Sequence, residues 1–300
     1  MDWVQIMALE RPIAESDCFY ETTGSGTSNH LANFSLQSSM PTIRSTTTWL
    51  ILLSLNVAAV VTANIALLWS ELAAEEPASQ GVSAYAPADD LIAQVDDYVA
   101  GFEKSLADET AFADGKESIA KDAHTLAVLG LALALHDTDH PGKQGAPALI
   151  EAAQALAQSA EAGDYPAAAK ALATVKQSRA GESTALARTW NDKVAPLESL
   201  MKQVTFVNNR LRRGVKRPDK KAQNARDAAV LAVIAQAAAA DVPDRPGADG
   251  EMWRQFSVEM RDAAGEVNGA LRADDKGRVE AAMARLSQSC DSCHAVFPQE

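Results

Sequence analysis

Residues 122–128 read Asp-Ala-His-Thr-Leu-Ala-Val, and residues 227–233 read Asp-Ala-Ala-Val-Leu-Ala-Val. Three further matches follow the same order along the chain, with small shifts between them. Four ordered matches indicate an internal repeat that sets the architecture. The alternative is two unrelated alanine-rich regions that align through their composition alone. The further matches pair residues 91–95 with 200–204, Pro141-Gly142 with Pro246-Gly247, and residues 177–183 with 288–294.

Each copy of the repeat reads as four helices. Apolar residues recur at helical spacing, alanine is abundant, aromatic residues make up 5% of the chain, and Pro-Gly pairs mark breaks between the periodic segments. Short connections favour antiparallel neighbours, so we expect an all-α fold of two tandem up-down-up-down four-helix bundles after an N-terminal transmembrane helix. The expected helices span residues 88–106, 116–136, 145–162 and 166–180 in the first copy, and 195–213, 220–240, 249–272 and 275–296 in the second.

The C-terminal residues Cys290-Asp291-Ser292-Cys293-His294 form a CxxCH motif, the attachment signature of a c-type haem. On a helix, positions i, i+3 and i+4 share one face, so both sulfurs and the imidazole point at the same flat group. The two thiols would form thioethers to the porphyrin, and His294 would be the proximal ligand of the iron. We therefore predict one covalently attached haem c. The first copy reads Arg-Ala-Gly-Glu-Ser at residues 179–183, without cysteine or histidine, which predicts a haem-free bundle.

Three other kinds of site use cysteines at a similar spacing: a thioredoxin-like redox motif, a zinc site and a disulfide. A thioredoxin-like CxxC needs a βαβ setting, and nothing near residue 290 reads as a strand. A zinc site needs four ligands at finger-like spacing, but Cys18, the remaining cysteine, is far away in sequence. A disulfide between residues three apart is strained. Haem is thus the chemistry that this motif favours.

A four-helix domain with CxxCH on its last helix resembles the class II c-type cytochromes, the cytochrome c-prime family. The resemblance covers residues 193–300 through the haem motif, and residues 88–190 only through the repeat. The basic residue that often follows the family's motif is replaced here by Pro298.

The resemblance also implies a role for Met201. Its stretch Leu197-Glu-Ser-Leu-Met-Lys202 is similar to one on the family's first helix, where a methionine binds the iron in the six-coordinate branch. An apolar side chain closes the distal face in the five-coordinate branch. Met201 is therefore the candidate sixth ligand, and the alternative is a packing role in the core stripe with Leu197, Leu200 and Val204.

Residues 48–69 form one apolar stretch without a charged residue, about 33 Å long as a helix and flanked by Trp49 and Trp69. We expect an uncleaved membrane anchor here, with a cleaved signal peptide near Ala73 as the alternative. Haem attachment through CxxCH takes place outside the bacterial cytoplasm, so the haem domain should face the periplasm. It would be a periplasmic protein if the signal were cleaved.

The predicted organisation has five parts. The first part is rich in Ser, Thr, Asn and Gly, a composition typical of disorder. Met40 is a candidate for the true translation start, which would make the residues before it a gene-model extension. The parts are a disordered segment (1–47), the transmembrane anchor (48–69), a flexible linker (70–87), a haem-free bundle (88–192) and a haem-binding bundle (193–300).

The formal net charge of −13 argues against a nucleic-acid partner. Residues 210–221 nevertheless form a basic island, which either contacts an acidic partner or anionic headgroups or is a solvated turn. Trp253 is a further candidate neighbour of the porphyrin, or a plain core residue.

No nucleophile–base constellation suggests turnover, so we expect electron transfer rather than an enzyme. The expected partners are a redox protein or a membrane electron-transport component, with a second copy of the chain in a homodimer as an alternative. The alternative function is a five-coordinate haem that binds nitric oxide or carbon monoxide. A third possible function is structural, with the haem-free bundle binding a partner protein.

Overall fold

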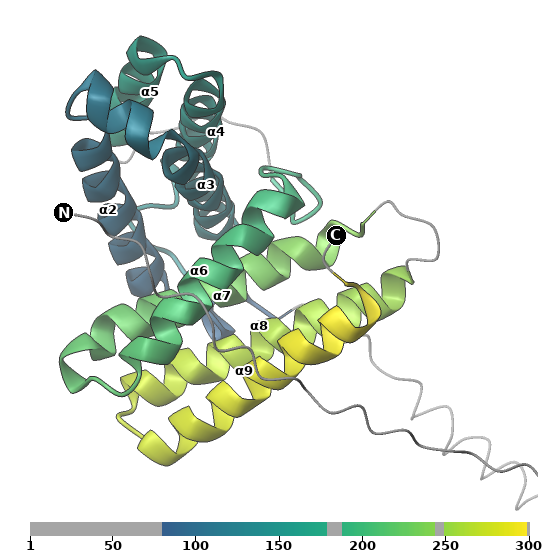
Figure 1. Cartoon of the computed structure of the whole chain (residues 1–300). Helices are drawn as coiled ribbons and strands as arrows, with labels where there is room; N and C mark the ends of the chain where they lie inside the picture. Colours follow the sequence, from purple (N-terminus) through teal and green to yellow (C-terminus); the bar gives the residue numbers. More distant parts are fainter. Residues whose placement is uncertain (1–79, 179–187, 244–248, 299–300) are drawn as a thin grey trace, which may run out of the picture. The chain divides into compact units, whose positions relative to one another are not determined.

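The computed structural model describes residues 80–178, 188–243 and 249–298, which belong to one compact unit (Figure 1). These described residues contain helices and no strand, which confirms the all-α class. The α-helices are α2 (Ala88–Ser105), α3 (Glu109–Ala134), α4 (Ala146–Ala162), α5 (Tyr165–Ser178), α6 (Leu197–Gly214), α7 (Lys221–Ala240), α8 (Gly250–Arg272) and α9 (Lys276–Val296), with 3-10 turns η1 (Val82–Ala84) and η2 (Pro218–Lys220).

The eight helices lie close to the expected segments, with one clear difference. Helix α3 begins at Glu109, well before the expected residue 116. The cause is Asp108, whose side chain accepts a hydrogen bond from the backbone N–H of Ala111 at 2.8 Å and so caps the helix. Asp249 and Asp275 cap α8 and α9 in the same way.

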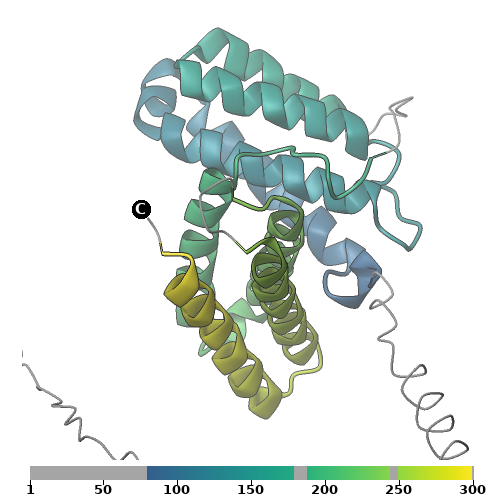
Figure 2. The same ribbon diagram turned by 90° about the vertical axis from the view of Figure 1, so that its right-hand side faces the viewer.

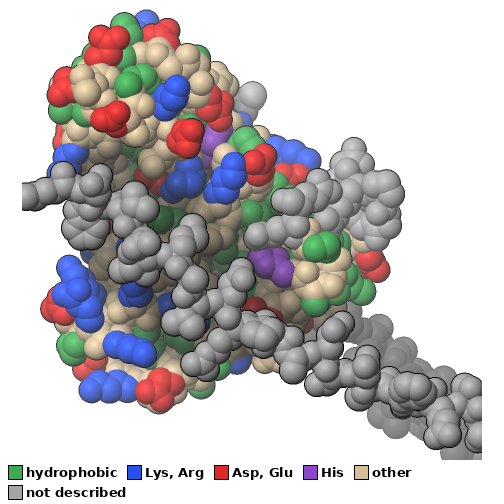
Figure 3. All heavy atoms as spheres, viewed as in Figure 1, with side chains coloured by type: hydrophobic (Ala, Val, Ile, Leu, Met, Phe, Trp, Pro, Cys, Tyr) green, Lys and Arg blue, Asp and Glu red, His purple; other side chains and the backbone are tan. Residues whose placement is uncertain are grey.

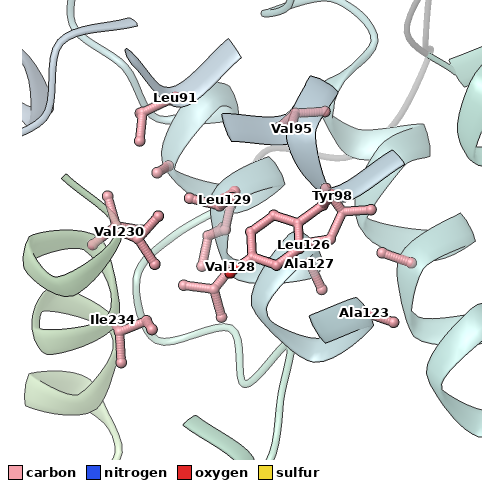
Figure 4. Packing of buried hydrophobic residues seen from close by; sticks show 14 of the residues in the cluster. Leu91, Val95, Tyr98, Ala123, Leu126, Ala127, Val128, Leu129, Val230 and Ile234 are labelled. Carbon is pink, nitrogen blue, oxygen red and sulfur yellow. The ribbon is translucent and has the colours of Figure 1, made fainter. Parts of the chain in front are cut away.

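Helices α3 and α7 carry the two copies of the repeated motif, and they pack against each other. The close-up in Figure 4 shows Val128 of α3 beside Val230 and Ile234 of α7, all buried. Between Ala228 and Ala235 of α7 no side chain reaches solvent to more than 1%. A helix that is apolar on every side must be covered on every side, so these two helices form the centre of the fold.

The contacts around this centre are reciprocal between the copies. Arg226, which precedes the motif on α7, forms an ion pair with Asp97 of α2 at 3.0 Å. Its counterpart Lys121, which precedes the motif on α3, lies 4.6 Å from the ring centroid of Phe206 on α6. Asp97 and Phe206 occupy matching positions, each three residues after a matched glutamine (Gln94 and Gln203). In each case the residue before the motif in one copy contacts the first helix of the other copy. This exchange is expected for two related units around an approximate two-fold axis.

The two groups of four helices differ in how their first and last helices meet. In the first group, α5 packs closely on α4 and also touches α2 and α3. In the second group, α9 packs closely on α8 alone among the described helices, and α6 and α9 are not a closely packed pair. Figure 2 shows α8 and α9 as a V that opens toward the C-terminal end of α9. One long side of α9 is thus not used for helix packing.

The segment before α2 was expected to be a flexible linker as far as residue 87. Its described end instead packs into the core, where Val82, Tyr85 and Ala86 are each at most 3% exposed. Tyr85 lies directly over Gly265 of α8, and the guanidinium of Arg261 lies 5.2 Å from the Tyr85 ring centroid. Apolar side chains at positions 82 and 85 explain this docking, because their burial is favourable.

The expected anchor at residues 48–69 and the segment before it lie outside the described residues. Within residues 80–178, 188–243 and 249–298, no helix is both long and apolar enough to span a bilayer.

Gly265 and Gly269 offer a matched test of the contact with Tyr85. A Cβ at Gly265 would lie 2.9 Å from the Tyr85 Cα, whereas a Cβ at Gly269 would meet nothing within 4 Å. We expect Gly265→Ala to lower the free energy of unfolding by on the order of 1–3 kcal/mol through overpacking. Gly269→Ala should raise it by about 0.5–1 kcal/mol through helix propensity. Urea titrations that found equal effects for the two variants would contradict this contact.

Candidate functional site

Helix α9 carries the CxxCH motif in its last two turns. Asp275 begins the helix by accepting a hydrogen bond from the backbone N–H of Arg278 at 3.0 Å. The helix is 21 residues long but buries only Ala282, Leu286 and Ser289. Cys290, Cys293 and His294 follow in the last two turns, where the two cysteines are half-buried and the histidine is exposed. The motif therefore lies on a helix of which only a narrow stripe is buried in the core.

Cys293 belongs to a small apolar cluster that is separate from the main core. Its buried members are Ala238, Trp253 and Phe297, and Cys293 packs against them as a partly buried residue. The Trp253 and Phe297 rings meet edge to face with centroids 5.3 Å apart, and the Trp253 indole N–H donates to the Ala238 carbonyl at 2.7 Å. The partly buried members are Leu197, Met201, Val242, Phe256 and Cys293.

Met201 is placed on α6 at the same cluster. It is partly buried and contacts both the main core and the Cys293 cluster, whereas its neighbour Leu200 is only 3% exposed. The structure therefore brings the candidate sixth ligand and one of the two motif cysteines into one apolar group. Met201 and Val204 of the predicted core stripe also pack against the main core, as the alternative expects.

The two remaining motif residues have different surroundings. Cys290 is half-buried and lies outside the Cys293 cluster, and neither cysteine is part of a disulfide. Burial raises the pKa of the Cys290 thiol, while the positive charge of Arg212 on α6 acts weakly in the opposite direction. His294 is exposed, so its imidazole lies at the surface of the helix.

The donor set suits a haem better than a bare metal ion. No three His, Cys, Asp or Glu side chains converge into a metal-binding group in the part of the chain that the structure describes. A haem brings four nitrogen ligands of its own, so the protein need supply only axial ligands and an apolar surface. Cys290 and Cys293 would hold it covalently, His294 would bind the iron, and the side chains around Met201 and Trp253 would supply the apolar surface.

Sequence reasoning identified Trp253 but missed Phe256. Phe256 lies three residues after Trp253 on α8, and its ring centroid is 6.3 Å from that of Phe297. The i, i+3 spacing of the two aromatic residues could have indicated it.

The segment of the first copy that corresponds to the haem motif, residues 179–183, lies outside the described residues. The buried histidines of the first group have structural partners. His124 Nε2 lies 2.9 Å from a carboxylate oxygen of Glu161, and His136 Nε2 lies 3.1 Å from the Ala86 carbonyl oxygen. The described part of the first copy thus uses these two histidines to connect elements.

Comparisons with known proteins give no match: no family model fits the chain, and no curated protein or solved structure is significantly similar to it. The resemblance to the cytochrome c-prime family therefore stays a prediction from the motif and the helical pattern.

The raised pKa of Cys290 has a measurable consequence. Only the thiolate reacts with alkylating agents, so in haem-free folded protein Cys290 should react more slowly than an ordinary cysteine near neutral pH. In a Cys18→Ser/Cys293→Ser variant, the pH midpoint of iodoacetamide alkylation should lie above the ordinary cysteine value. The midpoint should return to that value in urea, where burial is lost. An unchanged midpoint on unfolding would show that Cys290 is not desolvated.

Proposed function

We propose that the chain is a membrane-anchored, periplasm-facing c-type cytochrome with one haem, which acts in electron transfer. In this proposal two tandem up-down-up-down four-helix bundles follow the transmembrane segment at residues 48–69, and the second bundle holds the haem. When bound, the haem supplies one-electron redox chemistry at its iron.

The observation that carries the proposal is the setting of the motif. Cys290, Cys293 and His294 follow one another on a single helix, and that helix leaves its side toward α6 free of close helix packing. In the first group the corresponding pair, α2 and α5, is in contact. A flat prosthetic group between the first and last helices would use apolar surface that helix packing leaves exposed.

The polarity of the surroundings supports electron transfer. Around Cys293 the residues are apolar or aromatic, and a low-polarity environment together with the axial ligands sets the reduction potential. His294 is exposed, so the proposed iron lies near the surface, where a redox partner can approach. A redox protein or a membrane electron-transport component is the partner that this location suits.

The first test measures whether haem is covalently bound and how many haems each chain carries. Protein made with the cell's haem-attachment machinery should keep its haem after denaturation, give a c-type pyridine haemochrome, and contain one haem per chain. Cys290→Ser/Cys293→Ser should carry no covalent haem, whereas Cys18→Ser should match the wild type. Haem that extracts into acid–acetone would refute covalent attachment, and two haems per chain would refute the haem-free first copy.

The second test asks whether Met201 binds the iron. A thioether ligand should make the oxidised iron low-spin, with the weak sulfur-to-iron charge-transfer band at the red end of the visible spectrum. Met201→Leu, which conserves volume, should abolish that band, lower the reduction potential and allow carbon monoxide to bind. Met260→Leu on α8, which also replaces a partly buried methionine, should change none of these.

A wild-type protein that is already high-spin and binds carbon monoxide would contradict ligation by Met201. The diatomic-gas-binding function would then replace electron transfer as the better proposal.

A further inference from the structure

We propose that the α6–α7 connection forms a binding site for a phosphate-bearing anion, separate from the haem site. The connection contains η2 and lies at the end of the molecule where Lys and Arg side chains gather in Figure 3 (lower left). It encloses a hollow of about 520 Å³, which is in the size range of small-molecule sites. The lining residues are Asp97, Arg210, Arg213, Gly214, Arg217, Lys220, Gln223 and Asn224.

The charge of the lining favours an anion. Four of the eight lining residues are cationic and one is anionic. That anionic residue, Asp97, is already paired with Arg226 at 3.0 Å. Arg210 and Arg217 also have carboxylate partners, whereas Arg213 and Lys220 have no ion-pair partner among the described residues. Two cationic groups are therefore available to a ligand, in a chain whose formal net charge is −13.

A buried polar group among the lining residues gives independent support. Asn224 is only 2% exposed, and its amide nitrogen Nδ2 has no hydrogen-bond partner. An unpaired buried donor costs free energy, and a ligand oxygen would satisfy it. Gly214 makes room for this amide, because a Cβ at that position would overlap the Asn224 side chain.

These groups match the chemistry of a phosphate. A guanidinium forms a planar fork of donors that fits phosphate oxygens, an ammonium adds a point charge, and the amide adds one more donor. A solvated basic patch that attracts anions only by its charge would not need a buried amide donor. The ligand is thus a soluble phosphate or pyrophosphate compound, or the phosphate of a lipid headgroup.

The test is calorimetric titration of the full-length chain with inorganic pyrophosphate. We expect binding that weakens as salt is added. Arg213→Gln/Lys220→Gln should weaken it at least about tenfold, since hydrogen bonds to charged groups are lost. Lys170→Gln/Lys276→Gln removes two exposed lysines elsewhere and should leave the affinity unchanged. Asn224→Asp, which keeps the size but repels an anion, should also abolish binding.

Titration in detergent with short-chain phosphatidylglycerol, with short-chain phosphatidylcholine as the control, distinguishes the two sources. Binding of the anionic lipid alone, competed by pyrophosphate and lost in the Arg213/Lys220 variant, would assign the site to a headgroup. Pyrophosphate binding without binding of the anionic lipid would assign it to a soluble ligand. Absence of both, or an equal loss in the Lys170/Lys276 control, would overturn the proposal.

Discussion

The packing of α3 against α7 is the constraint on which the remaining structure depends. Both helices are alanine-rich and buried on nearly every side, so each needs neighbours all around it. Small side chains let the partners come close, as at Gly130, where a Cβ would lie 2.9 Å from the Ile150 side chain. Helix α7 obtains its cover from α2, α3, α6 and α8. Because these four suffice, α9 is not needed to cover the centre and rests on α8.

The helices could be predicted from the sequence because their signals are local. All eight helical segments are predicted from apolar periodicity, Pro-Gly breaks and abundant alanine. The start of α3 differs from the predicted one because Asp108 caps the helix, and an aspartate before a helical run is a known start signal. The CxxCH motif is equally local, since i, i+3 and i+4 spacing on one helix fixes its geometry.

The features that could not be predicted depend on contacts between distant segments. The docking of Tyr85 on Gly265 joins two residues far apart in the chain, and nothing in either local sequence indicates the pair. The hollow beside Asn224 likewise requires α2, α6 and α7 to meet at one point. Periodicity predicts which face of a helix is apolar, but it does not say which helix will cover that face.

The contacts between the two groups suggest what the first group contributes to the site. Gln203 of α6 is fully buried; it donates a hydrogen bond to the Tyr98 hydroxyl oxygen at 2.6 Å and accepts one from Lys121. Burial of this amide without those partners would be costly, so the pair fixes the rotation of α6 about its axis.

Met201 lies two residues before Gln203, which on a helix places it on a different side. Anchoring Gln203 to the first group therefore sets the side of α6 on which Met201 lies, where it contacts the main core and the Cys293 cluster. In this view the copy without a haem motif acts as a support: it orients the helix that faces the motif, and so influences a site to which its described residues supply no ligand.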